Sequence, residues 1–167
     1  MGIIITGLVL GFWAGIAPGP LLALVVSESV ARGFGAGARV ALSPLITDIP
    51  IVALVLFASF RFTDSPLPFA LLGLTGAAYL IYLGVTGLRS PVKEQRGGGC
   101  SALGQGVLVN LLNPHPYLFW LGVGAPLLRK AYHASPASAF AFVAVFYLMM
   151  IGTKLIVAGF SARAGSL

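Results

Sequence analysis

The sequence Ala17-Pro18-Gly19-Pro20 places two prolines one residue apart in the middle of an apolar segment. Proline has no amide proton, and its ring pushes the preceding turn of a helix away. Pro18 and Pro20 would therefore leave the carbonyls of Ala14 and Ile16 without helical partners. In hydrocarbon such carbonyls need other donors, so broken backbone is tolerated only where it is buried in protein or lines a wet cavity. The stretch predicts a helix that is broken beside a cavity.

A second stretch, Asn113-Pro114-His115-Pro116, repeats the Pro-x-Pro pattern 96 positions later. By the same chemistry, Pro114 and Pro116 would free the carbonyls of Asn110 and Leu112. A matched pair of broken helices in the two halves of a chain points to the binding site of a transporter. We therefore predict an inverted repeat that relates the two motifs across the membrane. Two unrelated proline kinks are the alternative.

The composition indicates an integral membrane protein. The residues are 58% hydrophobic and 8% charged, with a mean hydropathy of +0.99, whereas soluble domains carry about a quarter charged residues. The net charge of +6 needs no nucleic acid to explain it, because the basic residues lie mostly in short loops. The single cysteine, Cys100, excludes an intrachain disulfide framework and a cysteine-rich metal site. No Ser/His/Asp set, metal-ligand spacing or phosphate loop is present, so we predict neither an enzyme nor a cofactor.

A spanning helix needs about 20 mostly apolar residues, and the sequence predicts an all-α membrane protein with one transmembrane domain over residues 1–167. The expected helices cover 3–26, 40–60, 66–88, 102–126 and 138–160, with a hydrophilic cytoplasmic loop at 89–101. We expect short turns at Gly33-Phe34-Gly35-Ala36-Gly37 and at 61–68. Helices 1 and 4 carry the proline breaks.

The distribution of Lys and Arg predicts an N-terminus outside the cytoplasmic (inner) membrane, because basic residues are enriched in cytoplasmic loops. In that orientation the cytoplasmic side holds six basic residues: Arg32, Arg39, Arg89, Lys93, Arg96 and Arg163. The outer side holds three: Arg61, Arg129 and Lys130. The remaining basic residue, Lys154, lies inside the fifth predicted segment.

A 3+3 inverted repeat requires six helices, and five are predicted up to Leu167. Either the chain is truncated before a sixth helix, or it is a five-helix variant whose open edge is covered by another subunit in a homo-oligomer. We favour truncation, because residues 161–167 resemble the start of a cytoplasmic loop.

Two charged residues, Asp48 and Lys154, lie inside predicted helices 2 and 5. A charge at the bilayer centre costs about 2.5–3.5 kcal/mol even on insertion scales. Their depths differ by only about 3 Å at a rise of about 1.5 Å per residue. We expect them to meet near the broken helices, as a salt bridge or as separate ligands for a zwitterion. Alternatively, Lys154 extends to the interface and Asp48 bonds backbone groups freed by Pro44 and Pro50.

Other polar residues near the second motif have two interpretations each. His115 could take up a proton near physiological pH or donate a neutral hydrogen bond to a freed carbonyl. For Asn110 and Asn113 a structural use is the default, and Tyr117 and Trp120 are expected to be packing aromatics. The predicted solute-binding residues are Pro18, Gly19, Pro20, Asp48, Asn113, Pro114, His115, Pro116 and Lys154.

These motifs resemble those of the LysE/RhtB family of amino-acid exporters. The resemblance rests on Ala-Pro-Gly-Pro in helix 1, Asn-Pro-x-Pro in helix 4, the Gly-rich stretch 32–37, Asp48, and the run from Gly76 to Gly84 in helix 3. It implies six helices, of which the last is absent from this chain, and export of amino acids or similar small solutes driven by the proton gradient. The expected partners are the solute and the lipid bilayer.

The resulting prediction is a secondary transporter that exports small zwitterionic solutes by alternating access, with the half-helix ends cradling the solute. A cation or metal exporter is the main alternative, although one Asp and one His are few hard ligands for a divalent ion and Lys154 would repel it. A purely structural membrane subunit is the other alternative.

Overall fold

The computed structural model describes residues 2–61 and 101–165, and every regular element in these ranges is a helix. The predicted third helix, 66–88, and the loop 89–101 (except Ser101) lie outside the described residues. The elements are α1 (Gly2–Ile16), α2 (Pro20–Arg32), α3 (Phe34–Ala41), α4 (Pro44–Arg61), α6 (Ala102–Leu112), α7 (Pro114–Phe119), the π-helical turn η1 (Trp120–Gly124), α8 (Ala125–Ala134) and α9 (Pro136–Ala164).

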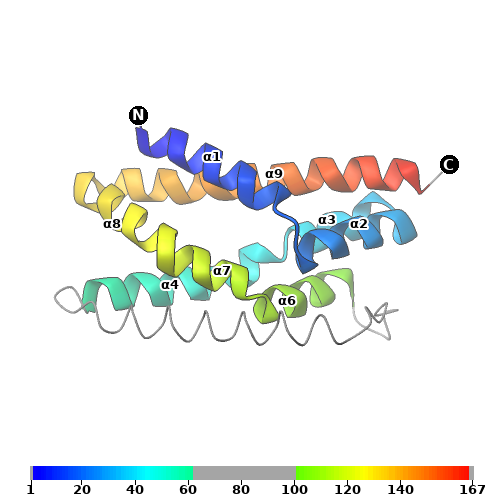
Figure 1. The fold of residues 1–167 in the computed structure, drawn as a ribbon, viewed down its shortest axis with the longest axis horizontal. Helices are drawn as coiled ribbons and strands as arrows, with labels where there is room; N and C mark the ends of the chain where they lie inside the picture. The colour runs from blue at the N-terminus through cyan, green and yellow to red at the C-terminus, as the bar shows by residue number, and fades with distance from the viewer. Residues whose placement is uncertain (1, 62–100, 166–167) are drawn as a thin grey trace.

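The first predicted segment is broken at the first proline motif. Helix α1 ends at Ile16, Gly19 is the extended N-cap of α2, and Pro20 takes the first helical position, where a missing amide proton removes no bond. The axes of α1 and α2 differ by 62°. In Figure 1, α1 lies along α9, and the chain then leaves α9 at the middle of the molecule before α2 begins.

The short turn expected between Gly33 and Gly37 is wrong. Only Gly33 leaves the helical conformation, with φ +81°, and α3 begins at Phe34. The reason is packing between helices: a Cβ at Gly37 would collide with the hydroxyl of Ser29 on α2. Close contact between α2 and α3 thus offsets the roughly 1 kcal/mol by which glycine disfavours a helix.

The fourth predicted segment, 102–126, is both more broken and longer than expected. Helix α6 ends at Leu112, Asn113 is the N-cap of α7, and helical structure then continues from Pro114 to Ala134. Between α7 and α8 the turn widens into η1, where the amide of Ala125 bonds the carbonyl of Trp120 five residues back. Such π-helical turns are frequent at functional sites.

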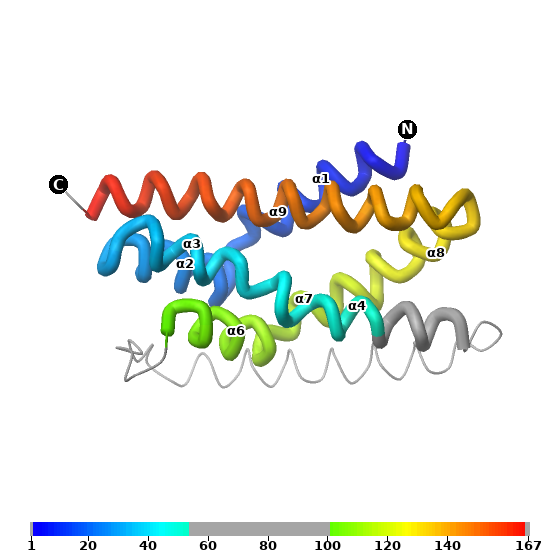
Figure 2. Tube along the Cα trace, turned by 180° about the vertical axis from the view of Figure 1, so that it is seen from behind, coloured from blue at the N-terminus to red at the C-terminus, as the bar shows by residue number. Residues whose placement is uncertain are grey.

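Helices α1 and α9 run side by side in the same direction (Figures 1 and 2). Gly7, Gly11 and Gly15, spaced four apart, lie buried on the α9 side of α1. A Cβ at Gly15 would lie 2.7 Å from the Cβ of Thr153. These glycines permit the close backbone approach that membrane helices use in place of a hydrophobic driving force.

By length and composition, Phe34–Ala53 and Pro136–Ala164 can each cross a membrane, and α1 with α2 makes a third candidate if the bent pair is counted as one span. Large apolar side chains are exposed on α9, including Phe140 at 78% and Leu148 at 72%. The helical fold is therefore compatible with a membrane protein. The described residues do not show the inverted repeat, and the single domain also stays a prediction.

The buried apolar side chains form two clusters, and Leu155 on α9 packs against both. One gathers Trp120, Phe142 and Phe146 where α8 and the first half of α9 meet η1. The other gathers Val25, Val40 and Ala102 where α2, α3 and α6 meet. The α1–α2 and α6–α7 breaks lie near the middle of the long axis (Figure 1).

Candidate functional site

A cavity of about 770 Å³ lies between the two broken helices. Its walls come from both breaks and from α4, α6, η1 and α9. All nine predicted solute-binding residues line it: Pro18, Gly19, Pro20, Asp48, Asn113, Pro114, His115, Pro116 and Lys154. The fold thus brings these residues together, while their role in binding a solute stays a prediction.

Asp48 is 3% exposed and is held by three side chains. Its Oδ1 accepts hydrogen bonds from Asn110 Nδ2 at 2.8 Å and from Thr47 Oγ1 at 3.1 Å. Its Oδ2 accepts one from the Tyr147 hydroxyl at 3.2 Å.

These partners reach Asp48 from different elements, Asn110 from α6 and Tyr147 from α9. All three partners are side chains, so the hydrogen bonds of Asp48 in the described residues do not serve backbone groups near Pro44 and Pro50. The network fixes the position of the carboxylate on the cavity wall. It also connects α4, α6 and α9.

Lys154 is 4% exposed and its ammonium is bound to the broken first helix. Nζ donates to the carbonyl of Ala14 at 2.9 Å and to that of Gly15 at 3.0 Å. The first of these is a carbonyl that Pro18 was predicted to free. The helix dipole makes this C-terminal end of α1 a favourable place for a cation.

Lys154 therefore follows neither the salt-bridge prediction nor the interfacial one. Within the described ranges it makes no ion pair with Asp48, although both line the same cavity. An ammonium has three N–H donors, and two are used by carbonyls. One donor remains, which fits the prediction of separate ligands.

The second break is closed by nearby residues. Asn113 Oδ1 accepts from the amide of His115 at 3.1 Å and so caps α7. The amide of Asn113 bonds the carbonyl of Asn110 at 3.2 Å, and the Tyr117 hydroxyl donates to the carbonyl of Leu111 at 2.9 Å. Asn113 thus has the structural role expected of it, while Tyr117 does more than pack. The His115 side chain is exposed on the cavity wall.

Comparison with known proteins identifies the family. The model of the LysE type translocators matches residues 13–165. The chain belongs to this family. The predicted resemblance to LysE/RhtB exporters is thus confirmed, and a translocator moves a solute across a membrane rather than converting it.

This LysE type translocator is similar to two curated proteins. It is 29% identical over 138 residues to the chemotactic transduction protein ChpE of Pseudomonas aeruginosa PAO1, covering 76% of this chain and 66% of ChpE. It is 27% identical over 141 residues to YcgF of Bacillus subtilis 168, a protein named for amino acid efflux, covering 80% of this chain and 68% of YcgF. The chain thus spans about two thirds of the length of these relatives. No solved structure matches it with comparable significance.

From the sequence we did not predict that Thr47 and Tyr147 would hydrogen-bond to Asp48. We expected Asn110 to have a structural use, as a partner for backbone groups, and not to bond Asp48. A signal existed for Tyr147, which lies seven residues before Lys154 and therefore on the same face of a helix. Asn110 lies one turn before Asn113, at the same break. Nothing in the sequence alone pairs either residue with Asp48, because each contact joins separate helices.

The described residues contain no group of three or more His, Cys, Asp or Glu side chains that could hold a metal ion. The alternative of a metal exporter therefore has no ligand cluster in this part of the translocator.

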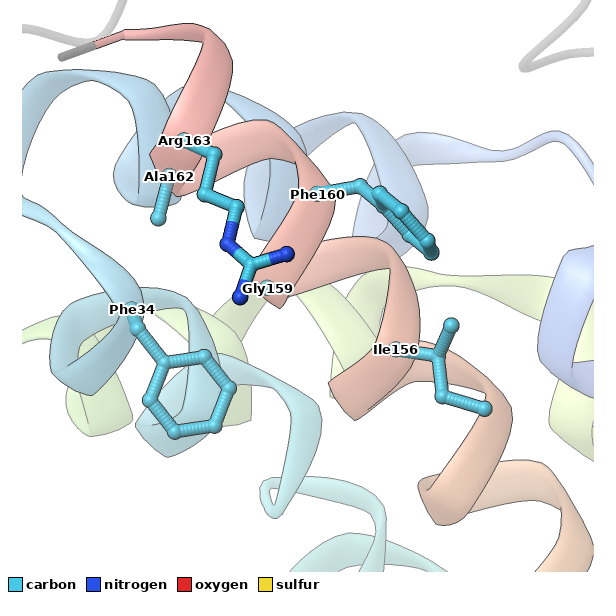
Figure 3. Close-up of a pocket in the computed structure, with 6 residues that line it drawn as sticks. All are labelled: Phe34, Ile156, Gly159, Phe160, Ala162 and Arg163. Carbon is cyan, nitrogen blue, oxygen red and sulfur yellow. The ribbon is translucent and has the colours of Figure 1, made fainter.

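A second hollow, of about 480 Å³, lies at the C-terminal end of α9 (Figure 3). It is lined by Phe34, Ile156, Gly159, Phe160, Ala162 and Arg163. None of the predicted solute-binding residues borders it, so the broken-helix cavity remains the candidate site.

Proposed function

We propose that this translocator exports amino acids or similar small zwitterionic solutes across the cytoplasmic membrane, driven by the proton gradient. One observation carries the proposal: Asp48 and Lys154 line one cavity between two broken helices without forming an ion pair in the described residues. A carboxylate and an ammonium on one wall complement the two charges of an amino acid. The naming of its relative YcgF for amino acid efflux supports the same function.

In the proposed binding mode, the solute's ammonium group donates to Asp48 and its carboxylate accepts from Lys154. The N-terminal end of α2, next to Gly19, adds a partial positive charge near the carboxylate. These two charged groups are preorganised, because side chains already bind the Asp48 carboxylate and backbone carbonyls already bind the Lys154 ammonium. The solute thus meets charges whose geometry is set before it arrives.

Proton coupling would follow if Asp48 takes up a proton when the solute's ammonium leaves, with His115 as a second proton site. Alternating access would then expose the cavity to each side of the membrane in turn, with the N-terminus outside and the two proline motifs related as an inverted repeat. Assembly with another subunit belongs to the same proposal.

The test is efflux of radiolabelled amino acids from proteoliposomes containing the full chain, with and without an imposed proton gradient. We expect gradient-dependent efflux of at least one amino acid. Asp48→Asn keeps the size of the side chain but removes its charge, and we expect it to abolish gradient-driven efflux. Glu28→Gln is the matched control, because Glu28 lies outside the cavity and pairs with Arg32 at 3.0 Å. Wild-type efflux in Asp48→Asn across the pH range would contradict the proposal.

A further inference from the structure

One part of the cavity wall is apolar and includes three aromatic side chains. Leu118, Phe119 and Trp120 come from α7 and η1, and Phe146 and Met150 come from α9. The rings of Phe119 and Phe146 stack with centroids 4.9 Å apart, and Trp120 meets Phe146 edge-on at 5.5 Å. Rings that pack in this way are fixed in place and give the wall a defined shape.

The charged groups of the cavity are few. In the proposed binding mode Asp48 and Lys154 are both used by the solute's own ammonium and carboxylate. Asp48 is the one carboxylate among the described residues that line the cavity. In the whole sequence the other acidic residues are Glu28, Asp64 and Glu94; Glu28 pairs with Arg32, and the other two fall in predicted loops.

A solute whose second ammonium group lies against this part of the wall would therefore bring an unpaired charge against rings and aliphatic side chains. Burial of a charge without a partner is strongly unfavourable, whereas an apolar side chain placed there gains contacts and leaves water. A binding site that leaves a polar group unpaired rejects that solute more strongly than it rejects one that differs by a single methylene. For one methylene the rates of the two solutes differ by about 10–200-fold. The cavity, at about 770 Å³, lies within the usual range of small-molecule sites, about 300–1,000 Å³.

We propose that the exported solutes are amino acids with uncharged, apolar side chains, of leucine to phenylalanine size, and that basic amino acids are rejected. This inference rests on the proposed function and adds the substrate class. Leu118 and Phe119 form the part of the wall that contacts the solute's side chain, since both are only partly buried beside the more deeply buried Trp120 and Phe146.

The test compares radiolabelled leucine, phenylalanine and lysine, each loaded into proteoliposomes with the full chain and released under one imposed proton gradient. We expect initial rates for leucine and phenylalanine at least about tenfold above that for lysine. Lysine efflux as fast as leucine efflux would overturn this inference and leave the proposed function standing. Failure to carry any amino acid would overturn the proposed function and the inference with it.

A pair of variants tests the position of the wall. Leu118→Asp places a second carboxylate beside the solute's side chain, and we expect the lysine-to-leucine rate ratio to rise by at least about tenfold. Leu118→Asn is the matched control, equal in size to Leu118→Asp but uncharged, and should raise that ratio far less than Leu118→Asp does. The ratio is measured within one preparation, so a lower amount of inserted protein does not change it. An unchanged ratio in Leu118→Asp would overturn the assignment of this wall, and the wild-type panel stands without either variant.

Discussion

Asp48 and Lys154 are nearly fully buried, at 3% and 4% exposed, and a buried charge is tolerated only when other groups replace its hydration. Three side chains do this for Asp48 and two backbone carbonyls do it for Lys154. In the part of the chain that is described, every buried side-chain nitrogen and oxygen has a hydrogen-bond partner. The two charges are thereby held apart, rather than neutralising each other.

Tyr147→Phe tests whether the position of Asp48 matters. The substitution keeps the ring and removes the hydrogen bond to Asp48 Oδ2, and bonds to charged groups contribute about 1.5–3 kcal/mol. We expect a lower melting temperature in detergent and slower gradient-driven efflux. Tyr117→Phe is the control, because its hydroxyl bonds the carbonyl of Leu111 instead, so efflux should be retained. Equal efflux in the two variants would count against a role for Tyr147 in positioning Asp48.

At the scale of the elements, the two broken helices are stabilised in different ways. The end of α1 depends on Lys154, which lies 139 and 140 residues away from its two carbonyl partners. The start of α7 depends on Asn113, the residue directly before it. The first break is therefore coupled to the packing of α9, while the second forms from local sequence.

Lys154→Met tests the stabilisation of the first break. The change keeps an unbranched chain but leaves the carbonyls of Ala14 and Gly15 without their donor, and an unsatisfied buried polar group costs about 1–3 kcal/mol. We expect a lower melting temperature in detergent, together with loss of efflux. Lys130→Met, at an exposed position on α8, should leave the melting temperature unchanged. A Lys154→Met protein as stable as wild type would show that the ammonium does not stabilise the end of α1.

Gly11→Ala tests the contact between α1 and α9. A Cβ at this position would collide with the backbone carbonyl oxygen of Phe146, which cannot move without shifting α9. Overpacking of this kind typically costs about 1–3 kcal/mol, and we expect a correspondingly lower melting temperature. Gly152→Ala on α9 is the control, since nothing lies within 4 Å of its added Cβ and alanine favours a helix by about 1 kcal/mol. A Gly11→Ala protein no less stable than Gly152→Ala would contradict the close packing.

The breaks at Pro18 and Pro114 were predictable because the missing amide proton is a property of the residue itself. The helix that begins at Phe34 was not, since glycines normally disfavour helices and here packing on Ser29 overrides that preference. The hydrogen bond from the Tyr147 hydroxyl to Asp48 was not predictable either, because it depends on the relative positions of α4 and α9. Local chemistry thus indicated the candidate site, and tertiary contacts determined the hydrogen bonds around Asp48.

At the scale of the whole molecule, α1 and α9 run parallel, while the chain from α6 through α8 runs in the opposite direction (Figure 1). This agrees with alternating passes in which the first and fifth predicted segments share a direction. The Arg32 end of α2 and the Arg163 end of α9 lie at the same end of the molecule, and Arg129 and Lys130 on α8 lie at the other.

This separation of basic residues leads to a prediction about orientation. Six Lys and Arg residues belong to the side predicted to be cytoplasmic and three to the outer side, and basic loops are retained in the cytoplasm. Cys100, the single cysteine, should therefore react with a membrane-impermeant maleimide in inside-out vesicles and stay unlabelled in intact cells.

In a Cys100→Ser background, His133→Cys, at an exposed position near the end of α8, should show the opposite pattern. Labelling of Cys100 in intact cells with protection of the His133→Cys thiol would place the N-terminus inside. The end of the molecule that carries the N-terminus and α8 would then face the cytoplasm (Figure 1).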